Sequence, residues 1–132
     1  MTEARVRWTQ DDRYAGESAS GHEIVMDAGS DKQANSPMEL VLIALCGCTA
    51  SDVVVILRKK REPFTSLEVR ASAERAETVP KIYTSIRLTY RVGGNVTHKA
   101  MEDAVRLSKE KYCSVSAMLE KSAKIEFAIE YS

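Results

Sequence analysis

One segment, residues 37–60, constrains the fold of this chain more than any other. The run Ser36-Pro37-Met38-Glu39 has the form of a helix start, with Ser at the N-cap, Pro at the first helical position and Glu three residues after the cap. The basic run Arg58-Lys59-Lys60-Arg61 suits the C-terminal end of a helix dipole, and Pro63 stops the helix. These signals predict a helix from Pro37 to about Lys60.

The middle of this helix, residues 40–57, is apolar almost all round and is about as long as a membrane span. Its centre, however, holds six small or polar residues: Cys46, Gly47, Cys48, Thr49, Ser51 and Asp52. A carboxylate exposed to lipid at that depth would cost about 3 kcal/mol or more, so the helix is better placed inside protein, buried on nearly all sides. Because one chain of 132 residues can rarely surround such a helix, the pattern indicates an intertwined dimer.

The remaining elements follow from alternation and turn residues. Alternating apolar and polar residues predict strands at 4–8, 13–18, 23–27, 67–74, 82–92 and 125–131. Thr97 can cap a helix that reaches Lys111, and Ser114 can cap a short helix over 115–121. The order βββ-α-ββ-αα-β predicts an α+β fold, with residues 1–132 forming a single domain.

Charge and composition exclude several function classes. The 19 Lys and Arg residues balance the 19 Asp and Glu residues, whereas nucleic-acid binders and polybasic membrane-surface proteins usually carry a basic excess. Residues 1–7 are polar and mixed in charge, unlike a signal peptide, which predicts a cytoplasmic protein. In a reducing cytosol its three cysteines are thiols, and an odd number fits no disulfide framework.

The pair Cys46 and Cys48 does not predict a metal site. Residues two apart on a helix point about 200° away from each other, so both thiols cannot serve one ion without breaking the helix. The sequence has no second Cys pair and no His pair at ligand spacing, so we expect neither a metal nor a cofactor. Taken alone, each of these cysteines is more simply a small buried hydrophobic residue.

Cys113 is a stronger candidate for thiol chemistry. It precedes a predicted helix, where the dipole and the free N–H groups should stabilise a thiolate and lower the pKa of the thiol. The alternative is a turn residue packed under that helix. Asp52 lies one turn after Cys48 and would disfavour a thiolate there, so an activating cation would have to come from elsewhere in the fold.

Several of these motifs together resemble the OsmC/Ohr family, and most closely its YhfA-like branch. The resemblance rests on the run 36–40, on Cys48 inside the apolar helix, on the run 110–119 around Cys113, and on the run 16–22. It implies a small cytosolic, thiol-dependent peroxidase that reduces organic hydroperoxides. It also implies an intertwined homodimer whose sheets wrap the central, Cys-bearing helices, with the active sites at the interface.

The resemblance assigns roles position by position. Cys48 matches the peroxidatic cysteine and Cys113 the resolving cysteine, and the partner that resets them would be a dithiol reductant, in this family often a lipoylated protein. Arg13 lies close to the place of the family's peroxide-site Arg. Glu39 stands beside the place of the family's Glu, which Met38 occupies here. The alternative is a non-catalytic dimer that binds a hydrophobic small molecule or acts in regulation; Met38 favours that alternative, and the two matching cysteines favour the enzyme.

Overall fold

The computed structural model describes all 132 residues and divides into two compact units, Met1–Leu42 and Ile43–Ser132. The element order confirms the predicted α+β succession, with one additional π-helical turn. In chain order the elements are β1 (Ala4–Gln10), β2 (Arg13–Ser18), β3 (Glu23–Asp27), α1 (Pro37–Lys59), β4 (Phe64–Arg75), β5 (Tyr83–Gly94), α2 (His98–Leu107), η1 (Ser108–Tyr112), α3 (Ser114–Leu119) and β6 (Lys124–Tyr131).

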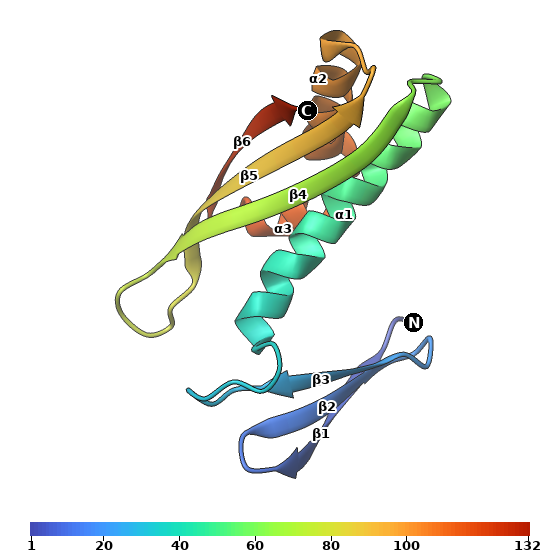
Figure 1. Ribbon diagram of the computed structural model, residues 1–132. Helices are drawn as coiled ribbons and strands as arrows, with labels where there is room; N and C mark the ends of the chain where they lie inside the picture. Colours follow the sequence, from blue (N-terminus) through green and yellow to red (C-terminus); the bar gives the residue numbers. More distant parts are fainter. The chain divides into compact units, whose positions relative to one another are not determined.

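The first unit is built on a three-stranded antiparallel sheet in the order β1-β2-β3 (Figure 1). Its register pairs Val6 with Gly16 and Gly16 with Ile24, so these three residues share one face. Trp8 lies on that same face, two residues after Val6. Val6 is 59% exposed and Trp8 65% exposed, which leaves this apolar face largely uncovered in the single chain.

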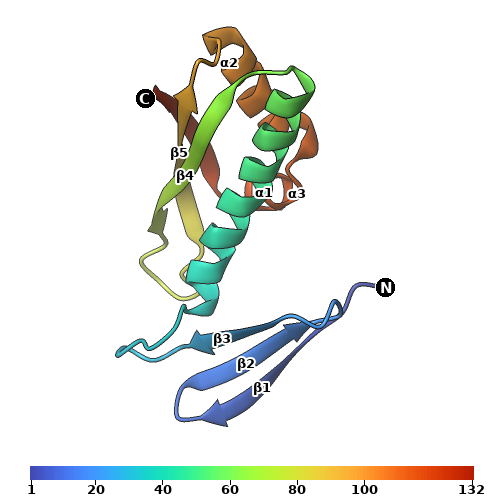
Figure 2. The same cartoon turned by 45° about the vertical axis from the view of Figure 1, so that its right-hand side comes forward.

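The second unit has its own three-stranded sheet, in the order β4-β5-β6. β4 and β5 pair antiparallel, whereas β5 and β6 pair parallel, and the chain segment that joins β5 to β6 carries α2, η1 and α3. Figures 1 and 2 show these helices and α1 on one face of the sheet. β5 alternates accordingly: Ile86, Leu88 and Tyr90 are buried, while Arg87 and Arg91 are exposed. The core of the second unit therefore lies between its sheet and its helices.

Helix α1 begins with the predicted capping box and ends at Lys59, one residue before the predicted end. The Ser36 amide donates to Glu39 Oε1 at 2.8 Å, and the Glu39 amide donates to Ser36 Oγ at 3.2 Å. The fully buried residues recur every fourth position and form one stripe: Leu45, Thr49, Val53 and Leu57. Because only 22% of its most apolar stretch is buried, a single chain does not cover this helix on nearly all sides. By length and composition alone α1 could cross a membrane. This is weak evidence for a membrane protein, because core helices of soluble proteins can be equally long and apolar.

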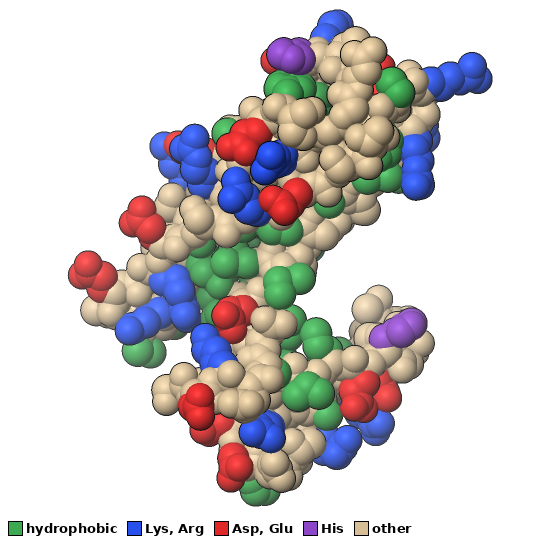
Figure 3. All heavy atoms as spheres, in the orientation of Figure 1, with side chains coloured by type: hydrophobic (Ala, Val, Ile, Leu, Met, Phe, Trp, Pro, Cys, Tyr) green, Lys and Arg blue, Asp and Glu red, His purple; other side chains and the backbone are tan.

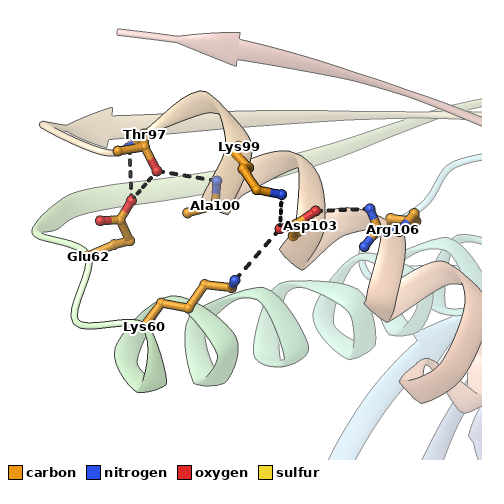
Figure 4. Close-up of polar contacts among 7 residues, drawn as sticks. All are labelled: Lys60, Glu62, Thr97, Lys99, Ala100, Asp103 and Arg106. Carbon is orange, nitrogen blue, oxygen red and sulfur yellow. Dashed lines mark hydrogen bonds and ion pairs between the residues drawn. The ribbon is translucent and has the colours of Figure 1, made fainter.

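Polar contacts join the end of α1 to the start of α2 (Figure 4). Glu62 Oε1 accepts hydrogen bonds from the amide of Thr97 at 2.9 Å and from its hydroxyl at 2.6 Å, and the Thr97 hydroxyl oxygen accepts from the Ala100 amide at 3.2 Å. These contacts confirm Thr97 as the N-cap of α2. Asp103, one helical turn after Ala100, forms three ion pairs: with Lys60 at 3.7 Å, with Lys99 at 3.3 Å and with Arg106 at 2.9 Å.

Candidate active site

Three side chains that can take part in chemistry, two thiols and one carboxylate, lie close together in the second unit. Cys48 lies in the middle of α1, Asp52 follows it by one helical turn, and Cys113 directly precedes α3. The two Sγ atoms and a carboxylate oxygen of Asp52 all lie within 4.8 Å of one another. Cys113 is buried, at 3% exposure, whereas Cys48 and Asp52 are half-buried. The fold thus brings together two thiols that are 65 residues apart in the sequence.

A π-helical turn sets the position of Cys113. The predicted helix over 97–111 is wrong in its last turn, because α2 ends at Leu107 and residues 108–112 form η1. The Cys113 amide donates to the carbonyl oxygen of Ser108 at 2.8 Å, five residues back, so the turn holds one residue more than an α-turn. Cys113 itself, not the predicted Ser114, caps α3, and its sulfur accepts from the Ser116 amide at 3.4 Å.

A chain of buried hydroxyl groups leads to the carboxylate of Asp52. Ser108 Oγ donates to Asp52 Oδ2 at 2.9 Å, Thr49 Oγ1 lies 2.7 Å from Ser108 Oγ, and Tyr90 Oη lies 2.7 Å from Thr49 Oγ1. Each hydroxyl has a single proton, so the donation to Asp52 sets the direction of the whole chain: Tyr90 donates to Thr49, and Thr49 to Ser108. Burial raises the pKa of Tyr90 to about 12, which keeps its phenol protonated as the first donor.

The pKa of the Cys113 thiol differs from the sequence-based expectation. Burial raises the pKa of Cys113, and its hydrogen bond with Cys48 acts in the same direction, while the Ser116 amide lowers it only in part. The expectation of a lowered pKa is therefore wrong, because burial outweighs the hydrogen bond that the sulfur accepts from the Ser116 amide. Cys46 is half-buried, its pKa is also raised by burial, and it is not part of the group formed by Cys48, Asp52 and Cys113.

The other two predicted site residues, Arg13 and Glu39, belong to the first unit and have partners within it. Arg13 Nε lies 3.9 Å from Oδ2 of the buried Asp27. Glu39 accepts from the Ser36 amide and pairs with Lys32 at 3.4 Å, and these contacts lower the pKa of its carboxyl group. In this structure Glu39 therefore caps the start of α1.

A cavity of about 370 Å³ follows the side of α1 that starts at Ser51 and Asp52. Its lining residues on α1 recur at helical spacing, and the segment around η1 closes its other side. They are Ser51, Asp52, Val55, Ile56, Lys59, Lys60, Leu107 and Tyr112. The cavity has an apolar middle, the Asp52 carboxylate near the thiols and lysines toward the end of the helix, a lining typical of small-molecule sites.

The family resemblance selected Cys48 and Cys113, but the sequence analysis missed the chain of hydroxyl groups that leads to Asp52. A signal was present: Thr49 occupies the apolar stripe that contains Leu45 and Val53, and a buried hydroxyl group requires a partner. The identity of that partner could not be read, because Tyr90 and Ser108 come from β5 and η1, distant parts of the chain.

Comparisons with known proteins agree with this architecture. Residues 29–128 match the family model of the OsmC-like proteins. The chain is 47% identical over 129 residues to protein YhfA of Escherichia coli K12, with 97% of this chain and 96% of that protein covered.

Solved structures resemble the chain over almost its whole length. A hypothetical protein from Aquifex aeolicus is 34% identical, with a TM-score of 0.87 and coverage of 100% of this chain and 98% of that one. An organic hydroperoxide resistance protein OsmC from Legionella pneumophila is 14% identical, with a TM-score of 0.75 and coverage of 98% and 96%. At that identity the likeness concerns the fold alone.

Proposed function

Since the chain belongs to the OsmC-like family, we propose that it is a thiol-dependent peroxidase that reduces organic hydroperoxides. One observation carries the proposal: the sulfur atoms of Cys48 and Cys113 lie within 4.8 Å of each other. The carboxylate of Asp52 lies within the same distance of both, and Asp52 also lines a cavity with an apolar middle. The organic hydroperoxide resistance protein from Legionella pneumophila shares the fold and supports the choice of substrate class.

The proposed reaction has three balanced steps. Cys48, the more accessible of the two thiols, attacks the O–O bond of ROOH, which gives a Cys48 sulfenic acid and ROH; the sulfur is oxidised and the peroxide is reduced. The Cys113 thiol then attacks the sulfenic sulfur, so that a disulfide forms and water leaves. A dithiol reductant, for which a lipoylated protein is the family's precedent, exchanges with this disulfide, restores both thiols and is itself oxidised.

The remaining parts of the proposal follow the family pattern. Arg13 would supply the cation that orients the peroxide, and Glu39 the acidic partner in that arrangement. Neither a metal nor a cofactor enters the reaction, because the oxidising equivalents come from the peroxide itself. A dithiol-dependent cycle of this kind suits a cytoplasmic protein.

We further propose that the working unit is a homodimer. Figure 3 shows hydrophobic side chains, in green, at the surface. Large apolar side chains are exposed in both units, among them Val6, Trp8, Ile24, Ile43 and Val55. An exposed apolar sheet face and an apolar helix covered on one side both require a partner, and a second copy of the chain supplies complementary surfaces of the same kind. Light scattering at micromolar concentration should find the dimer; a compact folded monomer there would contradict this.

A steady-state assay with cumene hydroperoxide and a dithiol reductant tests the peroxidase activity. Cys48→Ser should abolish turnover, and Cys46→Ser is the matched control on the same helix and should retain most of it. One equivalent of peroxide should lower the number of titratable thiols from three to one per chain, with Cys46 as the survivor. In Cys113→Ser, oxidation should stop at a sulfenic acid that dimedone traps.

The second candidate function is binding of a hydrophobic small molecule without catalysis. The observation that favours it is the cavity along α1, which is of ligand size and lined by Val55, Ile56 and Leu107. Peptide mapping decides between the two candidates: three unreacted thiols after peroxide treatment, in a folded dimer, would overturn the peroxidase and leave ligand binding.

A further inference from the structure

We propose that the reduced protein binds a thiophilic divalent metal ion, with Zn²⁺ as the natural probe, through Cys48 Sγ, Cys113 Sγ and a carboxylate oxygen of Asp52. The spacing of residues along the sequence predicts no metal site, because it reveals only ligands that lie close together in the chain, such as Cys46 and Cys48. The fold assembles a different set, with one ligand from another segment.

The spacing of the three donor atoms fits a tetrahedral ion after a small closure. Zn–S bonds of about 2.3 Å and Zn–O bonds of about 2.0 Å place neighbouring donors about 3.5–3.8 Å apart in a tetrahedral site. The donors here lie within 4.8 Å of one another, so each needs to move by roughly 1 Å or less, a shift within reach of side-chain rotation. Two sulfurs and one oxygen form a donor set that zinc accepts and that Mg²⁺ and Ca²⁺ do not prefer.

The carboxylate of Asp52 is already oriented as a metal ligand requires. Its Oδ2 accepts the Ser108 hydroxyl, which Thr49 and Tyr90 support in turn, and its Oδ1 receives no side-chain hydrogen bond in this chain of contacts. Ligating carboxylates in metalloproteins are commonly held by such outer hydrogen bonds. Thr49 and Ser108 are fully buried and act as positioning residues for Asp52.

Metal binding here is an exchange of ions without electron transfer. The ion displaces one proton from each thiol, so that M²⁺ and two R–SH groups give a bis-thiolate complex and two H⁺, with Asp52 as the third ligand. The complex carries one net negative charge, and Lys59 and Lys60 line the cavity that begins at Asp52. Because Asp52 lines that cavity, we expect water from the cavity to supply the fourth ligand.

This site does not depend on peroxide reduction, although it uses the same sulfurs. A disulfide between Cys48 and Cys113 has no thiolate to offer, so oxidation should release the ion. Conversely, a bound ion withdraws both sulfurs from attack on a peroxide. Metal binding and disulfide formation are thus alternative states of one pair of cysteines.

The test titrates the full-length reduced protein with Co²⁺ and then with Zn²⁺ under anaerobic conditions. We expect one ion per chain, visible Co²⁺ bands of a tetrahedral site and a near-ultraviolet thiolate-to-metal charge-transfer band. Zn²⁺ should displace Co²⁺ and bleach both features. Protein pre-oxidised to the disulfide should show neither.

Variants separate the ligands from a general thiol effect. Cys48→Ser and Cys113→Ser should lose the charge-transfer band or weaken it strongly, Asp52→Asn should weaken Zn²⁺ binding about 10- to 100-fold, and Cys46→Ser should bind like the wild type. Loss of binding in Cys46→Ser, or unchanged affinity in a folded Asp52→Asn, would overturn the site. The peroxidase assay is read independently: a protein that turns over peroxide but binds no Co²⁺ refutes only the metal site, and one that binds Co²⁺ without turnover refutes only the enzyme.

Discussion

The two sheets of this protein differ in how much of their surface the helices of their own unit cover. In the second unit, α1 and the helices between β5 and β6 cover one face of the sheet, and Leu88 and Tyr90 are buried beneath them. In the first unit, the residues of β1 are exposed throughout, including Trp8. The difference teaches that the sheet of residues 43–132 has a face buried by helices of the same unit, and the cluster of Cys48, Asp52 and Cys113 lies in that unit, whereas the sheet of residues 1–42 has no helix of its own unit packed along it and leaves Val6 and Trp8 exposed.

The largest expected effect lies in the core of the second unit. Leu57 is fully buried at the end of the α1 stripe, so Leu57→Ala should lower the free energy of unfolding by about 2–5 kcal/mol. Urea denaturation followed by circular dichroism measures this. Val79→Ala is the control, since Val79 is 87% exposed and its truncation should cost less than about 0.5 kcal/mol. Equal losses in both variants would contradict the assignment of this core.

The next effect concerns the polar chain under the cysteines. Thr49→Val removes the hydroxyl that joins Tyr90 to Ser108 and leaves buried polar groups short of a partner, which should cost about 1–3 kcal/mol of stability. Thr49→Ser keeps the hydroxyl and serves as the matched control. If the valine variant unfolds at the same urea concentration as the serine variant, the hydroxyl chain contributes nothing to this core.

A smaller effect is expected for the exposed sheet of the first unit. If a second copy covers it, Trp8→Ala should raise the dissociation constant of the dimer about tenfold, or roughly 1.4 kcal/mol, while Arg7→Ala on the opposite face should change it little. Sedimentation equilibrium over a dilution series gives both constants. If the dimer of Trp8→Ala has the same dissociation constant as the wild type, this face of the sheet is not part of the dimer interface.

The smallest effect is a pH dependence in the first unit. The pKa of Asp27 is lowered, first by the Gln33 amide and then by the Gly29 amide. Because the folded pKa lies below the unfolded value of 3.8, this contribution to stability is complete above that value and is lost as the pH falls through the folded pKa.

The Asp27 prediction is checked by denaturation at several pH values. Asp27→Asn should flatten the acid limb of the stability curve only in part, since other carboxyl groups with lowered pKa remain: Glu39, Glu62, Asp103 and Glu126. Asp31→Asn in the neighbouring exposed loop is the control. An acid limb identical in the wild type and in Asp27→Asn would show that Asp27 does not contribute to the loss of stability at acid pH.

Local interactions explain why so much of the fold could be predicted from the sequence. The capping box of α1 joins residues three apart, and the strands follow from a period of two, so both are written in consecutive residues. The last turn of the helix after Thr97 was mispredicted for the opposite reason. Nothing in the run around Ser108 distinguishes an α-turn from a π-turn until Cys113 and Ser108 take their places in the folded unit.

By itself, the sequence determined the element order and the position of α1, and its resemblance to the OsmC/Ohr family singled out Cys48 and Cys113 as the proposed redox pair. Only the tertiary structure decided that the Asp52 carboxylate lies with them, that Thr49, Ser108 and Tyr90 orient it, and that burial raises the pKa of Cys113. The physical reason is the distance along the chain over which each interaction acts. Caps and alternation act between near neighbours in the chain, whereas burial and hydrogen bonds between α1, β5 and η1 exist only once segments tens of residues apart have packed together.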